Sequence, residues 1–223
     1  MTSTVVIGHL TTAGKEARQK VCSGSSISKY SREQEPGVTR YAVSIPRDPQ
    51  DEKSVYVIEE YANQETLDAH IWSFAVIHMM KLLLSDGSVF GEAPDVYTME
   101  PVFSFSRPEI LKASDPYIVV ASLDYEEGTR AKAFDGWKRI VSESQKNEPG
   151  TLGYTILKDK DHENTIWTVE VYETEKYLRD VHAKSTVVTD DKTKYSDIKT
   201  NLDFAFLKIV AGYLHKEKQL SNM

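Results

Sequence analysis

A short motif occurs twice in this chain of 223 residues, and the repetition constrains the fold more than any other feature. The first copy reads EPGVTRY at residues 35–41, and the second reads EPGTLGY at residues 148–154. A second pair follows at nearly the same offset, VYVIEEY at residues 55–61 and IWTVEVY at residues 166–172. Because self-similarity at a long period indicates a repeated structural unit, we predict two tandem units of about 110 residues.

The boundary between the units is expected in the stretch RPEILKASDP, which starts at Arg107 and ends at Pro116. Two prolines in ten residues disfavour a continuous helix or strand there. We therefore predict a first unit at residues 1–107, a linker at residues 108–115 and a second unit at residues 116–223.

The order of elements is easiest to follow in the second unit. A β-branched run at residues 117–125 predicts a strand, and helical spacing of apolar residues follows, from Phe134 to Val141. The polar turn KDKDHEN separates two further predicted strands at residues 151–158 and 165–172. The EPG motif lies between the helix and the first of these strands, and we interpret it as a helix stop and a turn without a catalytic role.

The first unit repeats this order. Leu67, Ile71, Phe74, His78 and Leu82 recur at spacings of three and four, which predicts one continuous helix after the third strand. Final strands are expected at residues 97–106 and 204–215. Each unit then has the order β-α-β-β-α-β, which is the ferredoxin-like arrangement of an α+β fold. The polar stretch after His182 predicts that the corresponding helix of the second unit is shortened or broken.

Composition excludes several classes of protein. The net charge of −7 has no block of like charge, so we expect no nucleic-acid partner. Cys22 is the only cysteine, which rules out an intrachain disulfide and favours a reducing compartment. The N-terminus lacks the pattern of a secretory signal, and the longest apolar run is too short to cross a bilayer. These features predict a cytoplasmic protein without a membrane partner.

The positions that recur in both units resemble the antibiotic biosynthesis monooxygenase family. The matching residues are Gly14, Glu35-Pro36-Gly37, Glu59, Tyr61 and His70 in the first unit, and Gly128, Glu148-Pro149-Gly150, Glu170, Tyr172 and His182 in the second. The resemblance implies a dimeric α+β barrel in which two ferredoxin-like sheets pack together. A four-stranded sheet with helices on one face needs a partner for the other face. Here one chain would supply both halves as an intramolecular pseudo-dimer, and a further homodimer stays open.

The resemblance also implies a class of activity. Family members oxygenate electron-rich aromatic compounds such as anthrones and hydroquinones with molecular oxygen and without a metal or flavin, and others degrade haem or isomerise small metabolites. We therefore expect a cofactor-independent monooxygenase acting on a small aromatic, polyketide-like metabolite in secondary metabolism, with haem as an alternative by analogy only. A cofactor-free isomerase or cyclase, or a non-catalytic binding or stress-response barrel, are the competing interpretations.

Such chemistry needs a base of near-neutral pKa and a hydrogen-bond donor for the resulting oxyanion. His70, at the family's histidine position, is the first candidate for the base, although a capping histidine would be equally ordinary there. His78 on the predicted apolar stripe and His9, which replaces the leucine found at the matching position of the second unit, are the others. Tyr61 is the candidate donor, although plain aromatic packing would also explain it.

Substrate contacts are expected from aromatic and imidazole side chains near the same site. The candidates are Trp72, Phe74, Tyr41, Tyr172, His182 and Trp167. No metal site is expected, because the chain lacks Cys-x-x-Cys and HExxH motifs. If only one half holds an active site, the first half is favoured for its histidines, although the more open second half could also bind a ligand.

Overall fold

Eight antiparallel strands form one closed barrel in the computed structural model, which describes residues 3–23, 26–85, 87 and 89–216. The strands are β1 (Thr4–Thr11), β2 (Val38–Pro46), β3 (Ser54–Tyr61), β4 (Asp95–Ser106), β5 (Tyr117–Tyr125), β6 (Thr151–Asp159), β7 (Thr165–Tyr172) and β8 (Lys199–Tyr213). The α-helices are α1 (Lys15–Ser23), α2 (Ser26–Gln34), α3 (Gln64–Ile71), α4 (Phe74–Ser85), α5 (Arg130–Asn147), α6 (Glu175–Asp180) and α7 (Thr186–Lys194). Short 3-10 helices are η1 (Pro108–Leu111), η2 (His182–Lys184) and η3 (Ser196–Ile198).

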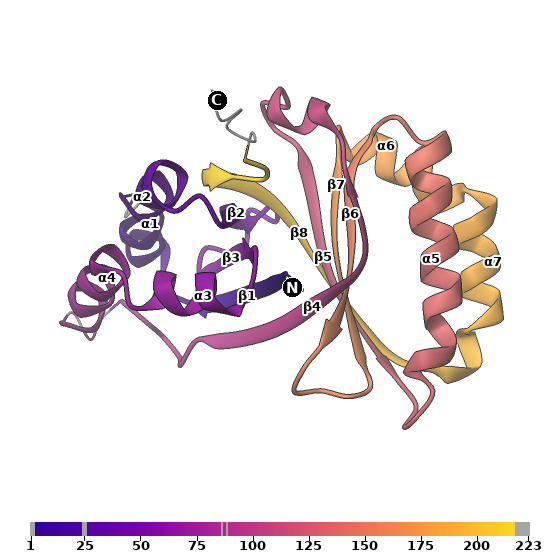
Figure 1. Cartoon of the computed structure of the whole chain (residues 1–223), viewed down its shortest axis with the longest axis horizontal. Coiled ribbons are helices and arrows are strands. Elements are labelled where there is room, and N and C mark those ends of the chain that lie inside the picture. The colour runs from indigo at the N-terminus through magenta and orange to yellow at the C-terminus, as the bar shows by residue number, and fades with distance from the viewer. Residues whose placement is uncertain (1–2, 24–25, 86, 88, 217–223) are drawn as a thin grey trace.

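The order of strands around the barrel separates two equivalent halves. The first half contributes β4-β1-β3-β2 and the second contributes β8-β5-β7-β6. Strand β2 pairs with β8, and β4 pairs with β6, so both seams join one half to the other. Helices α1 to α4 cover the outer face of the first half, and α5 to α7 cover that of the second (Figure 1). This arrangement confirms the predicted α+β fold of two ferredoxin-like units within one chain.

The barrel interior is an apolar core to which both halves contribute. Ile7 and Ile58 of the first half are fully buried in the same cluster as Ile118 and Leu207 of the second. Since strand side chains alternate in direction, the opposite faces of these strands are left for the helices and for the cavities described below.

The end of β8 ties the second half to the first. The hydroxyl of Tyr213 donates to the carbonyl of Val38 at 3.0 Å, and Nε of Arg40 donates to the carbonyl of Leu214 at 3.1 Å. Gly212 lies beside them with a φ of 92°, a conformation that favours glycine. A Cβ there would lie 1.9 Å from the carbonyl oxygen of Tyr41. The seam therefore depends on a glycine at this position.

Two elements differ from the sequence prediction. Strand β8 begins at Lys199, five residues before the expected Phe204. The single helix predicted to run through Leu67, Phe74 and His78 is instead two helices, because α3 ends at Ile71 and α4 begins at Phe74. Ser73 starts the second helix, and its Oγ accepts a hydrogen bond from the amide of Val76 at 3.3 Å. The predicted break in the second half is confirmed by α6, η2 and α7.

The EPG glycines serve close packing. Neither Gly37 nor Gly150 has a positive φ, so the backbone freedom expected of a turn glycine is not what these positions require. A Cβ on Gly150 would lie 2.5 Å from the ring of Tyr177, and one on Gly37 would lie 2.7 Å from Thr66. The motif therefore lets the helix after the third strand of each half approach the turn.

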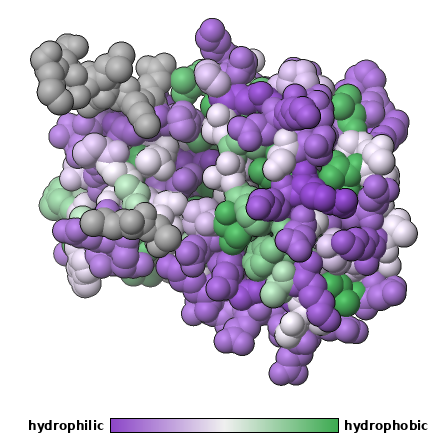
Figure 2. All heavy atoms as spheres, turned by 45° about the vertical axis from the view of Figure 1, so that its right-hand side comes forward, coloured by the Kyte–Doolittle hydropathy of each residue, from purple (hydrophilic) through white to green (hydrophobic). Residues whose placement is uncertain are grey.

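The outer surface is mainly hydrophilic. In the view that turns the helices of the second half forward, purple polar side chains enclose smaller green apolar areas (Figure 2). Within residues 3–23, 26–85 and 89–216, no helix combines the length and the apolarity needed to span a bilayer.

Candidate functional site: a glutamate–histidine pair in each half

His70 at the end of α3 is held by the glutamate of the first EPG motif. Its Nδ1 lies 2.8 Å from Oε2 of Glu35, and the imidazole is only 3% exposed. The hydroxyl of Ser31 on α2 donates to the same carboxylate oxygen at 2.7 Å. A carboxylate that accepts from Nδ1 fixes the tautomer and orientation of the ring, and leaves Nε2 with the lone pair.

Two tyrosines and a second glutamate surround the imidazole. The ring centroids of Tyr41 and Tyr61 lie 5.6 Å and 5.4 Å from that of His70. The hydroxyl of Tyr61 donates to Oε2 of Glu59 at 2.5 Å. Strand parity explains this grouping, since Glu59 and Tyr61 are two residues apart on β3 and so point to the same face.

This polar group lies at a cavity between the outer face of the sheet and the helices. The cavity has a volume of about 360 Å³, and Glu59, His70 and Tyr41 are among the residues that line it. Most of its remaining wall is apolar and comes from β1, α4 and the start of β4, including Val6, Met79, Met80 and Val96. An apolar cavity with a few converging polar groups is the usual form of a small-molecule site.

The second half reproduces the arrangement. Nδ1 of His182 lies 2.8 Å from Oε2 of Glu148, the glutamate of the second EPG motif, and this imidazole is 4% exposed. Tyr172 donates to Glu170 at 2.6 Å. The rings of Tyr154 and Tyr172 lie 5.5 Å and 5.2 Å from that of His182. The two halves therefore carry the same five side chains in the same relation.

A smaller cavity lies beside this second group. Its volume is about 230 Å³, and it is lined by Glu170, His182 and Tyr154 together with Trp137 of α5 and residues of α7 and β8. Both halves therefore combine an acid–base group with a cavity. The same five side chains occur in both halves, and the preference for the first half stays a prediction.

The environments of the glutamates shift their pKa values in different directions. Burial raises the pKa of Glu59 above its usual value, although hydrogen bonding from Tyr61 and the charge of His70 act against the shift. Burial would also raise the pKa of Glu148, but the hydrogen bond and charge of His182, with the hydroxyl of Thr151, outweigh it and lower that pKa. Burial, and then the Glu59 carboxylate, raise the pKa of Tyr41 well above its usual range.

Five of the predicted site residues come together in these two groups. Tyr41, Tyr61 and His70 meet in the first half, and Tyr172 and His182 meet in the second. Their roles in catalysis and binding stay predictions, although the geometry gives each a defined neighbour.

Three other candidates lie on the outer surface, away from the polar group. Trp72 and Phe74 are 76% and 80% exposed, and His78 is also exposed and stacks on Phe74 with ring centroids 5.7 Å apart. None of the three lines the cavity. Because α3 ends at Ile71 and α4 begins at Phe74, the predicted stripe does not continue, and Val76, Met79 and Met80 are the α4 residues that line the cavity.

His9 and Trp167 lie on the barrel side of the sheet. His9 alternates with Gly8 and Leu10, which line the cavity, and its ring stacks on Tyr56 at 4.5 Å. Trp167 packs on Tyr97 at 4.5 Å, and its Nε1 donates to Oδ2 of Asp159 at 2.9 Å. Neither joins the histidine pairs, because an odd spacing along a strand points a side chain to the opposite face.

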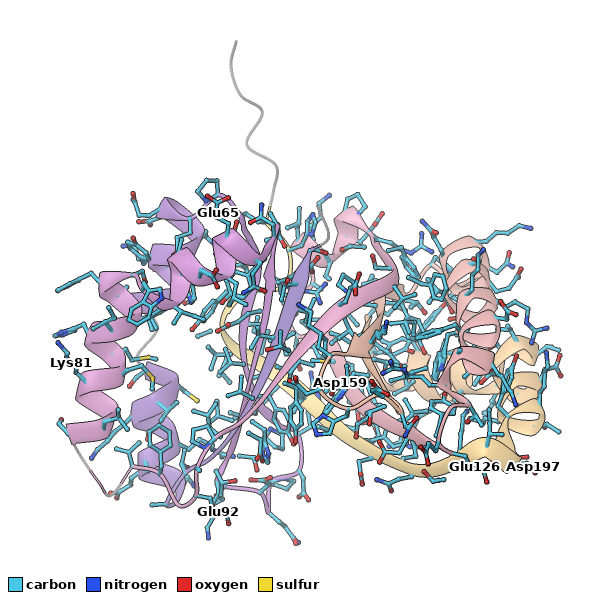
Figure 3. The ribbon with its side chains drawn as sticks, turned by 60° about the horizontal axis from the view of Figure 1, so that its bottom comes forward. Glu65, Lys81, Glu92, Glu126, Asp159 and Asp197 are labelled. Carbon is cyan, nitrogen blue, oxygen red and sulfur yellow. The ribbon has the colours of Figure 1, made fainter. Side chains whose placement is uncertain are left out.

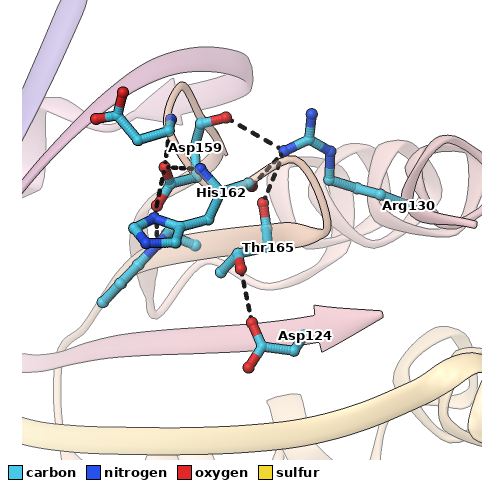
Figure 4. Close-up of polar contacts among 7 residues, drawn as sticks. Asp124, Arg130, Asp159, His162 and Thr165 are labelled. Carbon is cyan, nitrogen blue, oxygen red and sulfur yellow. Dashed lines mark hydrogen bonds and ion pairs between the residues drawn. The ribbon is translucent and has the colours of Figure 1, made fainter. Parts of the chain in front are cut away.

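Asp159, which binds Trp167, belongs to a hydrogen-bond network at the β6–β7 hairpin (Figure 4). Its Oδ1 accepts from the amides of Asp161 and His162, both at 2.9 Å. Arg130 donates to the carbonyls of Asp159, His162 and Thr165. These contacts hold the hairpin, so the network around Trp167 is structural.

The four glutamates carry the family resemblance, but the sequence interpretation assigns none of them an acid–base role. Glu35 and Glu148 were interpreted as parts of a turn, and Glu59 and Glu170 received no acid–base role. The available signal was that each glutamate recurs in both copies with the histidine that follows it. Turn chemistry explains the proline and close packing explains the glycine, but neither requires the glutamate.

The same side chains decide whether a metal ion or haem fits the site. In the described residues there is no group of three or more His, Cys, Asp or Glu side chains placed to hold a metal ion. Haem would need cationic partners for its propionates and an accessible axial ligand. The described lining of the first cavity contains no lysine or arginine, whereas that of the second contains Arg179, Lys192 and Lys199. The first cavity therefore does not match haem.

The structure is thus an α+β barrel with a glutamate–histidine pair beside a cavity in each half. The sequence matches the antibiotic biosynthesis monooxygenase family at residues 25–78 and 116–188, one segment in each half. These segments include both glutamate–histidine pairs. The chain belongs to the antibiotic biosynthesis monooxygenase family.

Solved structures with the same architecture cover nearly the whole chain. A candidate monooxygenase from Lactobacillus acidophilus is 17% identical, with a TM-score of 0.78 over 97% of this chain and 100% of its own. One from Fusobacterium nucleatum is 16% identical, with a TM-score of 0.82 over 97% and 98%. An anthrone oxidase-like protein is 12% identical, with a TM-score of 0.66 over 100% and 98%. At these identities the likeness establishes the fold. No curated protein sequence matches the chain.

Proposed function

We propose that the protein is a cofactor-independent monooxygenase that oxidises an electron-rich aromatic metabolite, such as an anthrone or a hydroquinone, with molecular oxygen. The observation that supports this proposal most directly is the imidazole of His70, bound to Glu35 and placed at the polar end of an apolar cavity. His182 and Glu148 repeat it. Family membership and the anthrone oxidase-like neighbour agree with the reaction class.

In the proposed reaction the histidine removes the proton that activates the substrate. Glu35 holds the proton of His70 on Nδ1, so Nε2 accepts the proton of the bound phenol or enol. The Glu35 carboxylate then stabilises the imidazolium that forms. Glu59 lies beside the same ring, and its raised pKa keeps a larger fraction of it protonated, so it serves as the donor to developing negative charge on oxygen.

The electrons come from the substrate. For an anthrone, the carbanion gives one electron to O₂, and the resulting radical and superoxide combine to form a C–O bond. Protonation of the peroxide by Glu59 and loss of water then leave a carbonyl. The CH₂ carbon loses four electrons, one oxygen atom enters the product, and the other leaves as water. The mainly apolar wall of the cavity favours this sequence because it limits the access of bulk water to the carbanion.

The test is oxygen consumption with a panel of anthrones and hydroquinones. His70→Ala and His182→Ala are each expected to lower kcat/KM of the half they occupy by about 10² to 10⁴, the range expected for loss of a general base. The double variant should lose oxygen consumption. His78→Ala is the matched control, because this exposed histidine lies outside the cavity and its replacement should leave the rate unchanged.

Two results would contradict the proposal. If the double variant consumed oxygen at the wild-type rate, the histidines would not be the bases. If the wild type converted the same compounds at an equal rate without oxygen, the acid–base groups would instead serve an isomerase or cyclase.

A further inference from the structure

The two cavities share their polar ends but differ in their walls. Counting from the equivalent histidines, Met79 and Met80 of α4 occupy the positions of Asp191 and Lys192 of α7. Val6 lies opposite Glu59 as Val119 lies opposite Glu170, so Gly8 of β1 corresponds to Ala121 of β5. Their neighbours on the next strand, Val96 and Phe204, therefore correspond as well. These positions are therefore apolar in the first half, whereas they carry charged and aromatic side chains in the second. By the same register His9 matches Ser122, so the expected match with a leucine was wrong.

Cationic groups distinguish the second cavity. Arg179, Lys192 and Lys199 line it together with two acidic residues, Glu170 and Asp191. Nζ of Lys199 lies 3.4 Å from Oδ2 of Asp191, so this pair is charge-balanced within the wall. Lys192 is exposed on α7 near the same place. The lining has three cationic side chains and two carboxylates, so it presents net positive charge to a ligand that approaches from this side.

The first cavity offers no such charge. Of its described lining residues, Glu59 is the only carboxylate, and none is a lysine or an arginine. Lys81 on α4 is exposed and points away from the barrel (Figure 3). An anionic ligand would therefore meet no lysine or arginine in the described lining of this half.

The second cavity also has flat walls. Trp137 and Tyr154 contribute aromatic surface, and Phe204 and Phe206 stack with ring centroids 5.8 Å apart and planes at 10°. The corresponding residues of β4, Val96 and Thr98, are small. Aromatic walls favour a planar ring because offset and edge contacts then cover both of its faces.

We propose that the two halves select different substrates: the second cavity takes a planar aromatic hydroxy acid, and the first takes an uncharged apolar compound. In the second half the hydroxyl of the ligand faces His182, and its carboxylate faces Lys192 and Lys199. This assignment rests on the proposed function, because it gives a substrate class to each of the same two sites.

The test compares two probes that differ only in the carboxylate, 6-hydroxy-2-naphthoate and 2-naphthol, by isothermal titration without oxygen turnover. Lys192→Met, which copies the first half, should weaken 6-hydroxy-2-naphthoate binding several-fold, and Lys192→Met with Lys199→Met about tenfold or more. Binding of 2-naphthol should change less than about twofold in either variant. Higher salt should reduce only the naphthoate affinity.

Two variants, each of which fills one cavity, show which cavity binds the naphthoate. Ala183→Trp fills the second cavity at a partly exposed position, and Ile71→Trp does the same at the equivalent position of the first. The first variant should abolish naphthoate binding, and the second should leave it intact. Thermal unfolding checks each variant, and Lys192→Met alone decides the question if Lys199→Met fails to fold.

The proposal is overturned if the wild type does not bind the naphthoate, if the lysine variants bind it with unchanged affinity, or if Ile71→Trp rather than Ala183→Trp removes binding. Its failure is separable from that of the proposed function. If naphthoate binding depended on the lysines but no substrate supported oxygen consumption, the charge selectivity would be confirmed and the proposed oxygenase activity would be rejected.

Discussion

Glu59 and Glu148 are both enclosed carboxyl groups, yet their surroundings shift their pKa values in opposite directions. Glu148 binds a histidine directly, at 2.8 Å, and its pKa is lowered. Glu59 binds tyrosine hydroxyls, and burial raises its pKa. Glu148 therefore holds a charge that stabilises the fold, whereas Glu59 is costly to ionise and is suited to hold a proton.

Glu59→Gln should change stability in a pH-dependent way. A carboxyl group with a raised pKa in the folded state contributes stability below its unfolded value of 4.5, and loses that contribution as the pH rises through the folded pKa. The variant should therefore gain stability relative to wild type as the pH rises from 4 to 8. Urea unfolding at a series of pH values measures the difference.

Glu148→Gln provides the control with the opposite sign. Its lowered pKa gives stability that is present above 4.5 and lost as the pH falls through the folded pKa. This variant should lose about 2 kcal/mol at neutral pH, the scale of a hydrogen bond to a charged group, and less in acid. If the change in unfolding free energy depended on pH in the same way for both variants, the opposite pKa shifts of Glu59 and Glu148 would be contradicted.

At the scale of elements, the turn before β6 and the helix after β7 are fitted to each other. Gly150 of the EPG motif packs against the ring of Tyr177 on α6. The Thr174 side chain caps that helix by accepting from the amide of Tyr177 at 3.1 Å. The helix is thus anchored at the turn, and the anchor places the following histidine over Glu148.

Gly150→Ala should destabilise the fold by about 1 to 3 kcal/mol, because the new Cβ would overlap the Tyr177 ring and force it to move. Gly14→Ala is a matched control, since a Cβ at Gly14 meets nothing within 4 Å and its φ is not positive. Thermal unfolding compares the two. Equal melting temperatures for the variants would show that the contact is not tight.

Elements were predicted better than the contacts between them. The strands of the second half start and end within a residue of their predicted limits at Tyr117–Tyr125 and Thr165–Tyr172, because β-branched runs and turns are local signals. The division of one helix at Ser73 was not predicted, because a serine cap does not interrupt an apolar periodicity. The Glu35–His70 contact joins residues far apart in sequence, and no local pattern encodes such a distance.

At the scale of the molecule, the halves are held by hydrogen-bonded seams as well as by the chain between them. Strand β8 pairs with β2 over Tyr41 to Pro46, and β4 pairs with β6 over Met99 to Ser106. Residues of both halves also share the barrel core. Covalent continuity at residues 108–115 is thus one of several connections.

Two co-expressed fragments, residues 1–107 and 116–223, should therefore assemble into a 1:1 complex. Each sheet alone would expose the apolar face that the barrel buries. Co-purification through a tag on one fragment, followed by light scattering, measures the assembly. Weakening the seam with Gly212→Ala, at a positive φ and against the Tyr41 carbonyl, should reduce it. Fragments that stay folded and separate would show that the seams are dispensable.

The single chain has a genetic consequence. In a barrel made from two copies of one subunit, every substitution appears twice, so a change that suits one pocket is imposed on the other. Here a mutation at Lys192 leaves Met80 untouched. Selection can therefore act on one pocket while the other keeps its inherited form, and a variant library directed at α7 alone would explore new ligands without loss of the first site.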